Sequence, residues 1–220
     1  AQRYTDALPH LYRAYKLDDS FVVSLFHAAL CESNLGSDVS VDSLLEIVLE
    51  KRDRLSPYYV QRAESYMAKM HGDRELAIEH LRKATAVGPG TKAWYNLAYD
   101  LMQVNKPREA REALMQLDPD EGAMAGWYSY WGLLANANHA LGNFEEAVEV
   151  IREGRKRFPE RRAALIRETE SLAALGRLDD LDQLFHEAGA SPATGAGNTV
   201  GALMTIAAAE LKAHGSEEAG

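Results

Sequence analysis

The chain has 220 residues, of which 46% are hydrophobic and 26% are charged, and its formal net charge is −9. This length allows one large domain or two small ones, and the acidic balance argues against a nucleic-acid partner, which requires clustered Lys and Arg. The sequence also contains no run of about 18 apolar residues, so it predicts no membrane contact. Because Cys31 is the single cysteine, an internal disulfide is excluded, and a reducing, cytoplasmic location fits.

A turn residue recurs along the chain at intervals of 33 to 37 residues, and each turn is followed by a helical pattern. Small or apolar residues stand five, nine and twelve positions after each turn, a spacing that places them on one stripe of a helix. The turn residues are Gln2, Gly36, Gly72, Asn105, Gly142 and Gly176. The stripes are Ala7, Leu11 and Ala14; Val41, Leu45 and Val48; Ala77, Leu81 and Ala84; Ala110, Leu114 and Leu117; Ala147, Ile151 and Gly154; and Leu181, Phe185 and Ala188.

The segment before each turn predicts a first helix that pairs with the second. A small residue stands seven positions before the turn, where it lets two backbones approach closely, and larger apolar residues lie further upstream in most copies. The small residues are Ala29, Ser65, Ala98, Ala135 and Thr169. Pro89, Pro119, Pro159 and Pro192 fall in the links between pairs, where a helix must stop. The copy at residues 91–119 is predicted to have a shortened second helix.

Four segments follow from this pattern. Residues 1–190 form a repeat array of about five and a half copies, of which the first is truncated because the chain opens inside a second helix. Residues 191–198 read as a linker of small residues. Residues 199–214 read as a final helix that caps the array against solvent, and residues 215–220 as a flexible tail. Since the first residue is Ala and not Met, we expect a fragment of a longer protein.

One copy carries the clearest motif, and it resembles the tetratricopeptide repeat (TPR). The family's small, aromatic and turn positions are occupied by Trp131, Leu134, Ala135, Gly142, Phe144, Ala147 and Pro159. This resemblance implies an all-α fold, a right-handed α-solenoid of antiparallel helix pairs in which the first helices line a concave groove, with the capping helix at its C-terminal end. The array also resembles the C-terminal repeat regions of larger bacterial regulators.

The groove implied by the resemblance gives a set of candidate partner-binding residues. In its middle, tyrosines, which offer wide contact area with a polar tip, stand beside Lys, Arg and Asn, and Lys and Arg can take a carboxylate. The positions are Phe26, Arg62, Tyr66, Lys69, Lys92, Tyr95, Asn96, Tyr99, Asn136 and His139. They predict a protein or peptide partner with an acidic group. The alternative interpretation is a set of half-exposed aromatics on a solvated, charged face.

Catalytic and cofactor motifs were sought and give no convergent set. The segment 88–92 lacks the ending of a phosphate loop, and Gly195, Gly197 and Gly201 lack the preceding strand of a dinucleotide loop. His27 and Cys31 are four residues apart on one helix, but a structural zinc ion needs four ligands and no second pair has this spacing. We therefore expect no enzyme, no cofactor and no metal.

The resulting functional prediction is a protein–protein interaction scaffold that binds a peptide or partner protein in its groove, as a regulatory module of a larger protein. A self-assembly module is the alternative, and an enzyme on a helical-repeat scaffold ranks third. The sequence leaves the oligomeric state open.

Overall fold

The structure is a computed structural model that describes residues 3–190 and 198–214, without the side chains of residues 38, 39 and 198. None of these residues lies in a strand, and the predicted all-α fold class is confirmed. The helices are α1 (Tyr4–Leu17), α2 (Val23–Leu35), α3 (Asp38–Glu50), η1 (Arg52–Arg54), α4 (Pro57–Met70), α5 (Arg74–Val87), α6 (Lys92–Gln103), α7 (Pro107–Leu114), η2 (Gly122–Met124), α8 (Ser129–Ala140), α9 (Phe144–Arg157), α10 (Arg162–Ala174), α11 (Leu178–Ala190) and α12 (Asn198–Ala213).

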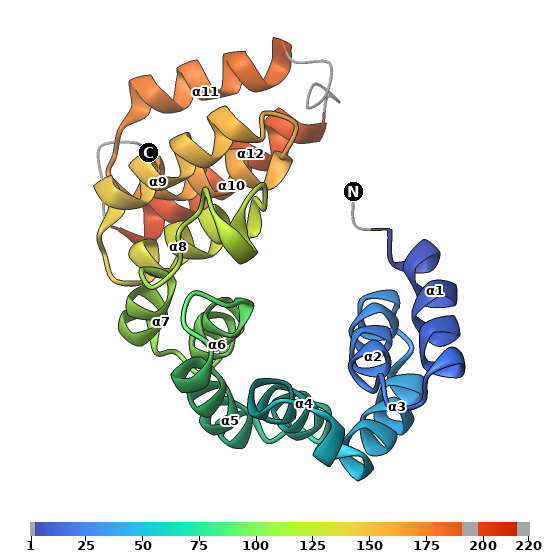
Figure 1. Ribbon diagram of the computed structural model, residues 1–220. Helices are drawn as coiled ribbons and strands as arrows, with labels where there is room; N and C mark the ends of the chain where they lie inside the picture. Colours follow the sequence, from blue (N-terminus) through green and yellow to red (C-terminus); the bar gives the residue numbers. More distant parts are fainter. Residues whose placement is uncertain (1–2, 191–197, 215–220) are drawn as a thin grey trace. The chain divides into compact units, whose positions relative to one another are not determined.

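The chain divides into two compact units, residues 1–100 and residues 101–220, and the boundary falls within α6. In unit 1, α1 packs against α2, α2 against α3, α3 against α4, and α4 against α5 (Figure 1). In unit 2 the same holds from α7 to α12, and α12 additionally packs along α10. Packing between chain neighbours is what a repeat array requires, because each copy buries its apolar stripe against the adjacent copies.

The predicted turns lie where the spacing placed them, and each contains the same type of backbone hydrogen bond. At Gly36, Gly72, Asn105, Gly142 and Gly176 the backbone is left-handed, with φ between 56° and 81°. In each turn the following residue's N–H donates to the carbonyl five residues before it, at 2.9–3.1 Å. This is the helix-ending motif that Gly favours, and Asn is the one other residue used because it tolerates this conformation best among residues with a Cβ. Gln2, the remaining predicted turn, lies outside the described residues.

Most of the predicted stripe residues are buried inside the two units, whereas Ala7, Leu11 and Ala14 of α1 and Phe185 of α11 are only half-buried. Val41, Leu45 and Val48 of α3 are fully buried and lie in the unit 1 core with Leu25 and Ala29 of α2. The small residues seven positions before the turns are all buried as well, at 3% exposure or less: Ala29, Ser65, Ala98, Ala135 and Thr169. The second helix of the copy at residues 91–119 is short, as predicted, because α7 has 8 residues. The segment predicted as a linker, apart from residue 198, and the predicted tail lie outside the described residues.

The N-terminus of α5 offers a direct test of one local interaction. The side chain of Asp73 accepts a hydrogen bond from the backbone N–H of Leu76 at 2.9 Å. Asn143 occupies the equivalent position before α9 but makes no such capping bond. We expect Asp73→Ala to lower the free energy of unfolding by about 1 kcal/mol, as measured by urea unfolding followed by circular dichroism. Asn143→Ala is the matched control, and an equal loss in both variants would contradict the capping role.

Candidate interaction surface

Two neighbouring first helices in unit 1 present polar and aromatic side chains in the same register. Arg62, Tyr66 and Lys69 follow one another on α4 at steps of four and three. On α6, Lys92, Asn96 and Tyr99 repeat the same steps. Such steps place three side chains on one face of a helix. We call these six residues, together with Ser65 and Asp100, the α4–α6 face.

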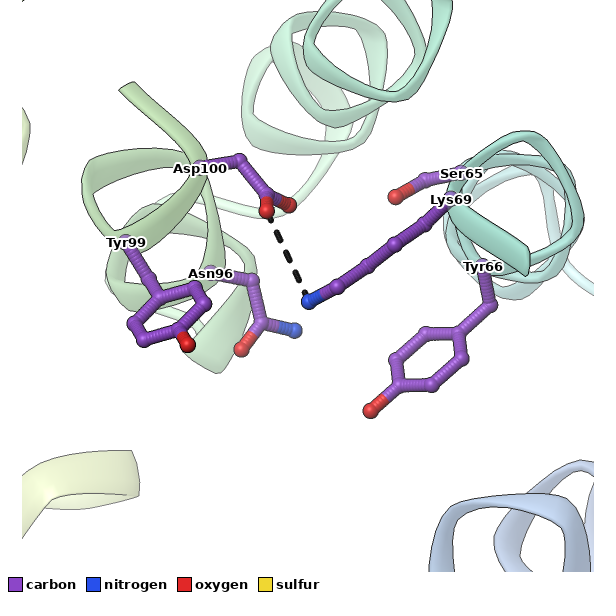
Figure 2. A pocket seen from close by; sticks show the side chains of 6 residues that line it. All are labelled: Ser65, Tyr66, Lys69, Asn96, Tyr99 and Asp100. Atoms are coloured by element: carbon purple, nitrogen blue, oxygen red, sulfur yellow. Dashed lines mark ion pairs between the residues drawn. The ribbon is translucent and has the colours of Figure 1, made fainter. Parts of the chain in front are cut away.

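The C-terminal half of the α4–α6 face is a hollow between the two helices, shown in Figure 2. It encloses about 270 Å³, part of which is open solvent. Lys69 extends across it, with its Nζ atom 3.5 Å from Oδ1 of Asp100. The same ammonium lies 4.9 Å from the ring centre of Tyr99 and 5.8 Å from that of Tyr66. Both distances allow cation–π attraction. The lining residues are Ser65, Tyr66, Lys69, Asn96, Tyr99 and Asp100.

Asp100 is the buried acid of the hollow, and two cations share it. Its side chain is 4% exposed, and its Oδ1 atom also lies 2.5 Å from Nη1 of Arg74. Lys69 is 31% exposed and Arg74 35%, so both cations reach solvent while the carboxylate does not. These three groups together carry one net positive charge. A buried acid that is held by the nearer arginine leaves the lysine able to attract a further anion.

The N-terminal half of the α4–α6 face carries basic groups that repel one another. The Arg62 guanidinium is 5% exposed and stacks over the rings of Phe26 and Tyr58, at 5.0 and 5.6 Å. Its Nε atom has no hydrogen-bond partner among the described residues. Burial lowers the pKa of Lys92, and the nearby Arg62 lowers it further. Burial also lowers the pKa of His27, with Arg62 and Lys92 acting in the same direction. This part of unit 1 therefore has a positive potential.

The structure brings some of the predicted partner-binding residues together and separates others. Tyr66, Lys69, Asn96 and Tyr99 line one hollow, and Tyr99 is exposed. Tyr95, which precedes Asn96 in the sequence, is half-buried. Asn136 and His139 belong to α8 in unit 2, and both are half-buried.

Phe26 was expected to contact a partner in the groove, and the structure contradicts this expectation. Its side chain is fully buried in the unit 1 core, with its ring edge-to-face against Tyr59 at 5.7 Å and Tyr66 at 6.5 Å. It therefore supports Tyr66 and Arg62 from beneath and cannot touch a partner. The reason is that α2 is apolar on nearly all sides, and such a helix is surrounded by neighbours.

The sequence analysis did not assign three residues that contribute to this surface: Ser65, Arg74 and Asp100. For Asp100 a signal existed, because it stands between the buried Leu97 and Leu101 of α6, where an acid needs a cationic partner. Of the weaker motifs, the segment 88–92 comprises the link between α5 and α6 and the first residue of α6, and Gly88 packs under Tyr58. Cys31 is buried and free, and Gly195 and Gly197 lie outside the described residues.

Residues 128–156 match the family model described as "Tetratricopeptide repeat". These residues are the end of the η2–α8 link together with most of the α8–α9 pair, in which the predicted Trp131 packs against Gly154. The chain therefore contains a tetratricopeptide repeat. Outside this matched copy, solved structures are similar to the chain in fold.

Several solved structures resemble this chain in fold over most of its length. A chain of the APC/C hetero-tetramer Cut9–Hcn1 has a TM-score of 0.67 and 13% identity; 97% of this protein is covered but only 40% of that chain. YrrB, described as a TPR protein with an unusual peptide-binding site, has a TM-score of 0.59 and 13% identity, covering 89% of this protein and 97% of YrrB. MamA (MSR-1) has a TM-score of 0.58 and 17% identity, covering 84% and 97%.

At these identities the likeness concerns the fold, which is that of TPR solenoids. No curated protein matches the sequence of this chain. Among its described helices, none combines the length and the apolar composition that crossing a bilayer requires.

Proposed function

We propose that this chain is a non-catalytic interaction scaffold, and that its α4–α6 face binds a peptide segment carrying an acidic group. The observation that carries the proposal is the sharing of one buried carboxylate, Asp100, by Lys69 and Arg74. One positive charge is left uncompensated at the mouth of a hollow flanked by Tyr66 and Tyr99. An acidic side chain or a terminal carboxylate satisfies that charge.

The aromatic residues supply the second part of the argument. Tyr99 is 40% exposed, so its ring has surface left for a partner, and tyrosine provides contact area at a low cost in side-chain entropy. The basic N-terminal half of the face, with Arg62 and Lys92, extends the positive potential along the same two helices. Long-range attraction of this kind mainly raises the rate of association. The same fold in YrrB, which is described as having a peptide-binding site, is consistent with this use. We propose further that the scaffold serves as a regulatory module within a larger protein.

The proposal is tested with random peptides displayed on phage and selected against the protein. We expect the selected peptides to share an Asp, a Glu or a free C-terminal carboxylate. In fluorescence polarisation with these peptides, Lys69→Met combined with Tyr99→Ala is expected to weaken binding about 30-fold, because hot-spot residues contribute about 2 kcal/mol or more.

The matched control is Lys83→Met combined with Val87→Ala on α5, which removes one exposed lysine and one exposed apolar side chain elsewhere in the same unit. The control is expected to leave the affinity unchanged. Peptides selected without any acidic group, or an equal loss in both double variants, would count against the proposed site.

A further inference from the structure

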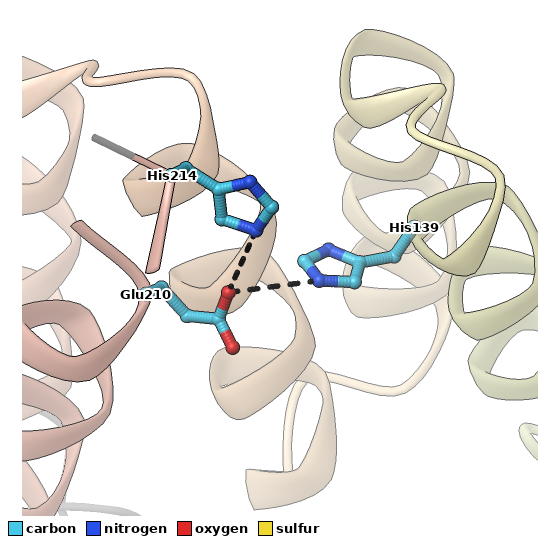
Figure 3. A group of neighbouring side chains, drawn as sticks. All are labelled: His139, Glu210 and His214. Carbon is cyan, nitrogen blue, oxygen red and sulfur yellow. Dashed lines mark ion pairs between the residues drawn. The ribbon is translucent and has the colours of Figure 1, made fainter. Parts of the chain in front are cut away.

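His139 meets two side chains that lie about 70 residues further along the chain, Glu210 and His214, and each of the three can bind a metal ion. His139 lies in the last turn of α8, Glu210 in the last turn of α12, and His214 directly after α12, as Figure 3 shows. The Nε2 atom of His214 lies 3.3 Å from Oε2 of Glu210, and Nε2 of His139 lies 3.8 Å from the same oxygen. The three candidate ligand atoms all lie within 4.8 Å of one another.

These separations are close to those of a tetrahedral zinc site. With zinc–ligand bonds of about 2.0–2.2 Å, two ligand atoms in a tetrahedron are about 3.4 Å apart. The 3.3 Å separation matches this value, and the 3.8 Å separation exceeds it by about 0.4 Å. Glu210 and His214 stand one helical turn apart, and the N–H of His214 donates to the carbonyl of Glu210 at 3.0 Å, so the backbone holds both on one face.

The surroundings of His139 orient its ring for this role. Its Nδ1 atom lies 3.3 Å from Oγ of Ser171, a buried residue of α10, which leaves Nε2 directed at Glu210. A hydrogen bond to the second ring nitrogen is the usual support of a metal-binding histidine. The ring of Phe144 lies 5.0 Å from the ring centres of both histidines and forms an apolar wall.

Burial and charged neighbours both act on the imidazole of His139. Burial lowers the pKa of His139, and the nearby His214 and Arg167 act in the same direction, whereas Glu210 and Glu170 oppose them. A neutral imidazole has the lone pair that a metal ion requires. A divalent ion held by two imidazole nitrogens and one carboxylate gives the site a net charge of one positive unit, which a water molecule or an anion in the fourth position can accommodate.

We propose that His139, Glu210 and His214 form a binding site for a zinc-type divalent cation, which ties the C-terminal helix α12 to α8. Two imidazoles and a carboxylate with an open fourth position are a ligand set that zinc uses. The site is distinct from the α4–α6 face and independent of the proposed function. The histidine and cysteine pair singled out in the sequence, His27 and Cys31, has no part in it.

The test uses the full chain with no affinity tag, stripped with a chelator, and titrated with ZnCl₂ in competition with a chromophoric chelator. We expect one zinc ion per chain. His139→Ala, Glu210→Gln and His214→Ala are each expected to weaken binding about 100-fold or more, and Ser171→Ala about tenfold, since a supporting hydrogen bond typically changes metal affinity by about 10–100-fold. Co²⁺ in place of zinc is expected to show the visible absorption of a four-coordinate site in the wild-type protein and not in the three ligand variants.

His71→Ala is the matched control, because His71 also lies beside a carboxylate, at 3.3 Å from Asp42, but without a second histidine. It is expected to leave both the affinity and the stoichiometry unchanged. Circular dichroism checks that each variant is folded, and Glu210→Gln keeps the shape of the side chain. Absence of stoichiometric zinc binding, or wild-type affinity in all three ligand variants, would show that the three residues form an ordinary ion pair and would overturn the proposal.

Discussion

Replacing Arg152 and Arg155 of α9 together by methionine is expected to lower the free energy of unfolding by about 3–5 kcal/mol at neutral pH. The reason is Glu168 of α10, whose side chain is 1% exposed. Nε of Arg152 lies 2.7 Å from one of its oxygens and Nε of Arg155 lies 3.1 Å from the other. Without these arginines a buried carboxylate has no partner, and breaking a buried ion pair from one side typically costs this amount.

Removing the two arginines is expected to cost more stability than removing the acid. This difference distinguishes the effect from a simple loss of contacts. Arg152 is 37% exposed and Arg155 is 26% exposed, so both can turn to water when Glu168 is removed. Glu168→Gln is therefore expected to cost less than the double arginine variant. Adding Glu168→Met to that double variant is expected to restore most of the lost stability, because an apolar side chain does not need a partner.

A control isolates the buried contact from the exposed ones that the same arginines make. Arg152 also pairs with Asp180 at 3.2 Å, and Arg155 pairs with Glu187 at 3.1 Å. Asp180→Asn combined with Glu187→Gln removes these outer pairs, and with them the Arg177–Asp180 pair at 2.6 Å, but leaves Glu168 with both arginines. This control is expected to cost less than about 1 kcal/mol per pair. Urea unfolding of all variants, followed by circular dichroism, makes the comparison. A control as destabilising as the double arginine variant would refute the special role of Glu168.

Gly154→Ala is expected to destabilise the protein by about 1–3 kcal/mol, although alanine favours helices more than glycine does. Gly154 lies within α9, against Trp131 of α8. A Cβ atom there would stand 2.7 Å from Cβ of Trp131 and 3.1 Å from its Cγ. Because the Trp131 Cβ is attached directly to the backbone, no side-chain rotation relieves the clash, and the two helices have to separate. Overpacking of this kind costs about 1–3 kcal/mol.

Replacing a second helical glycine by alanine is expected to change the stability in the opposite direction. Gly201 lies in α12, and a Cβ built there meets nothing within 4 Å. Gly201→Ala therefore gains the helix propensity of alanine, about 1 kcal/mol at most, without a clash. Thermal unfolding monitored by circular dichroism compares the two variants. A stabilised Gly154→Ala protein would show that α8 and α9 are not packed as closely as described.

Several features of this protein were determined by the sequence alone, because they depend on groups close along the chain. The left-handed turns at Gly142 and Gly176 follow from the residue type that tolerates positive φ. The buried stripe of α3 follows from helical periodicity, which relates residues three and four positions apart. The small residues between paired helices follow from the same repeat. These regularities suffice to predict the helix pairs and the TPR family.

The tertiary structure decided the rest, because a periodic pattern does not tell which side of a surrounded helix faces a neighbour. Phe26 was assigned to a groove and lies in the core. Asp100 became the shared partner of Lys69 and Arg74, which stand on other helices. His139 meets Glu210 and His214 only because α12 packs along α10. Contacts of this kind join residues far apart in the chain, and the packing of helices, which local spacing does not specify, brings them together.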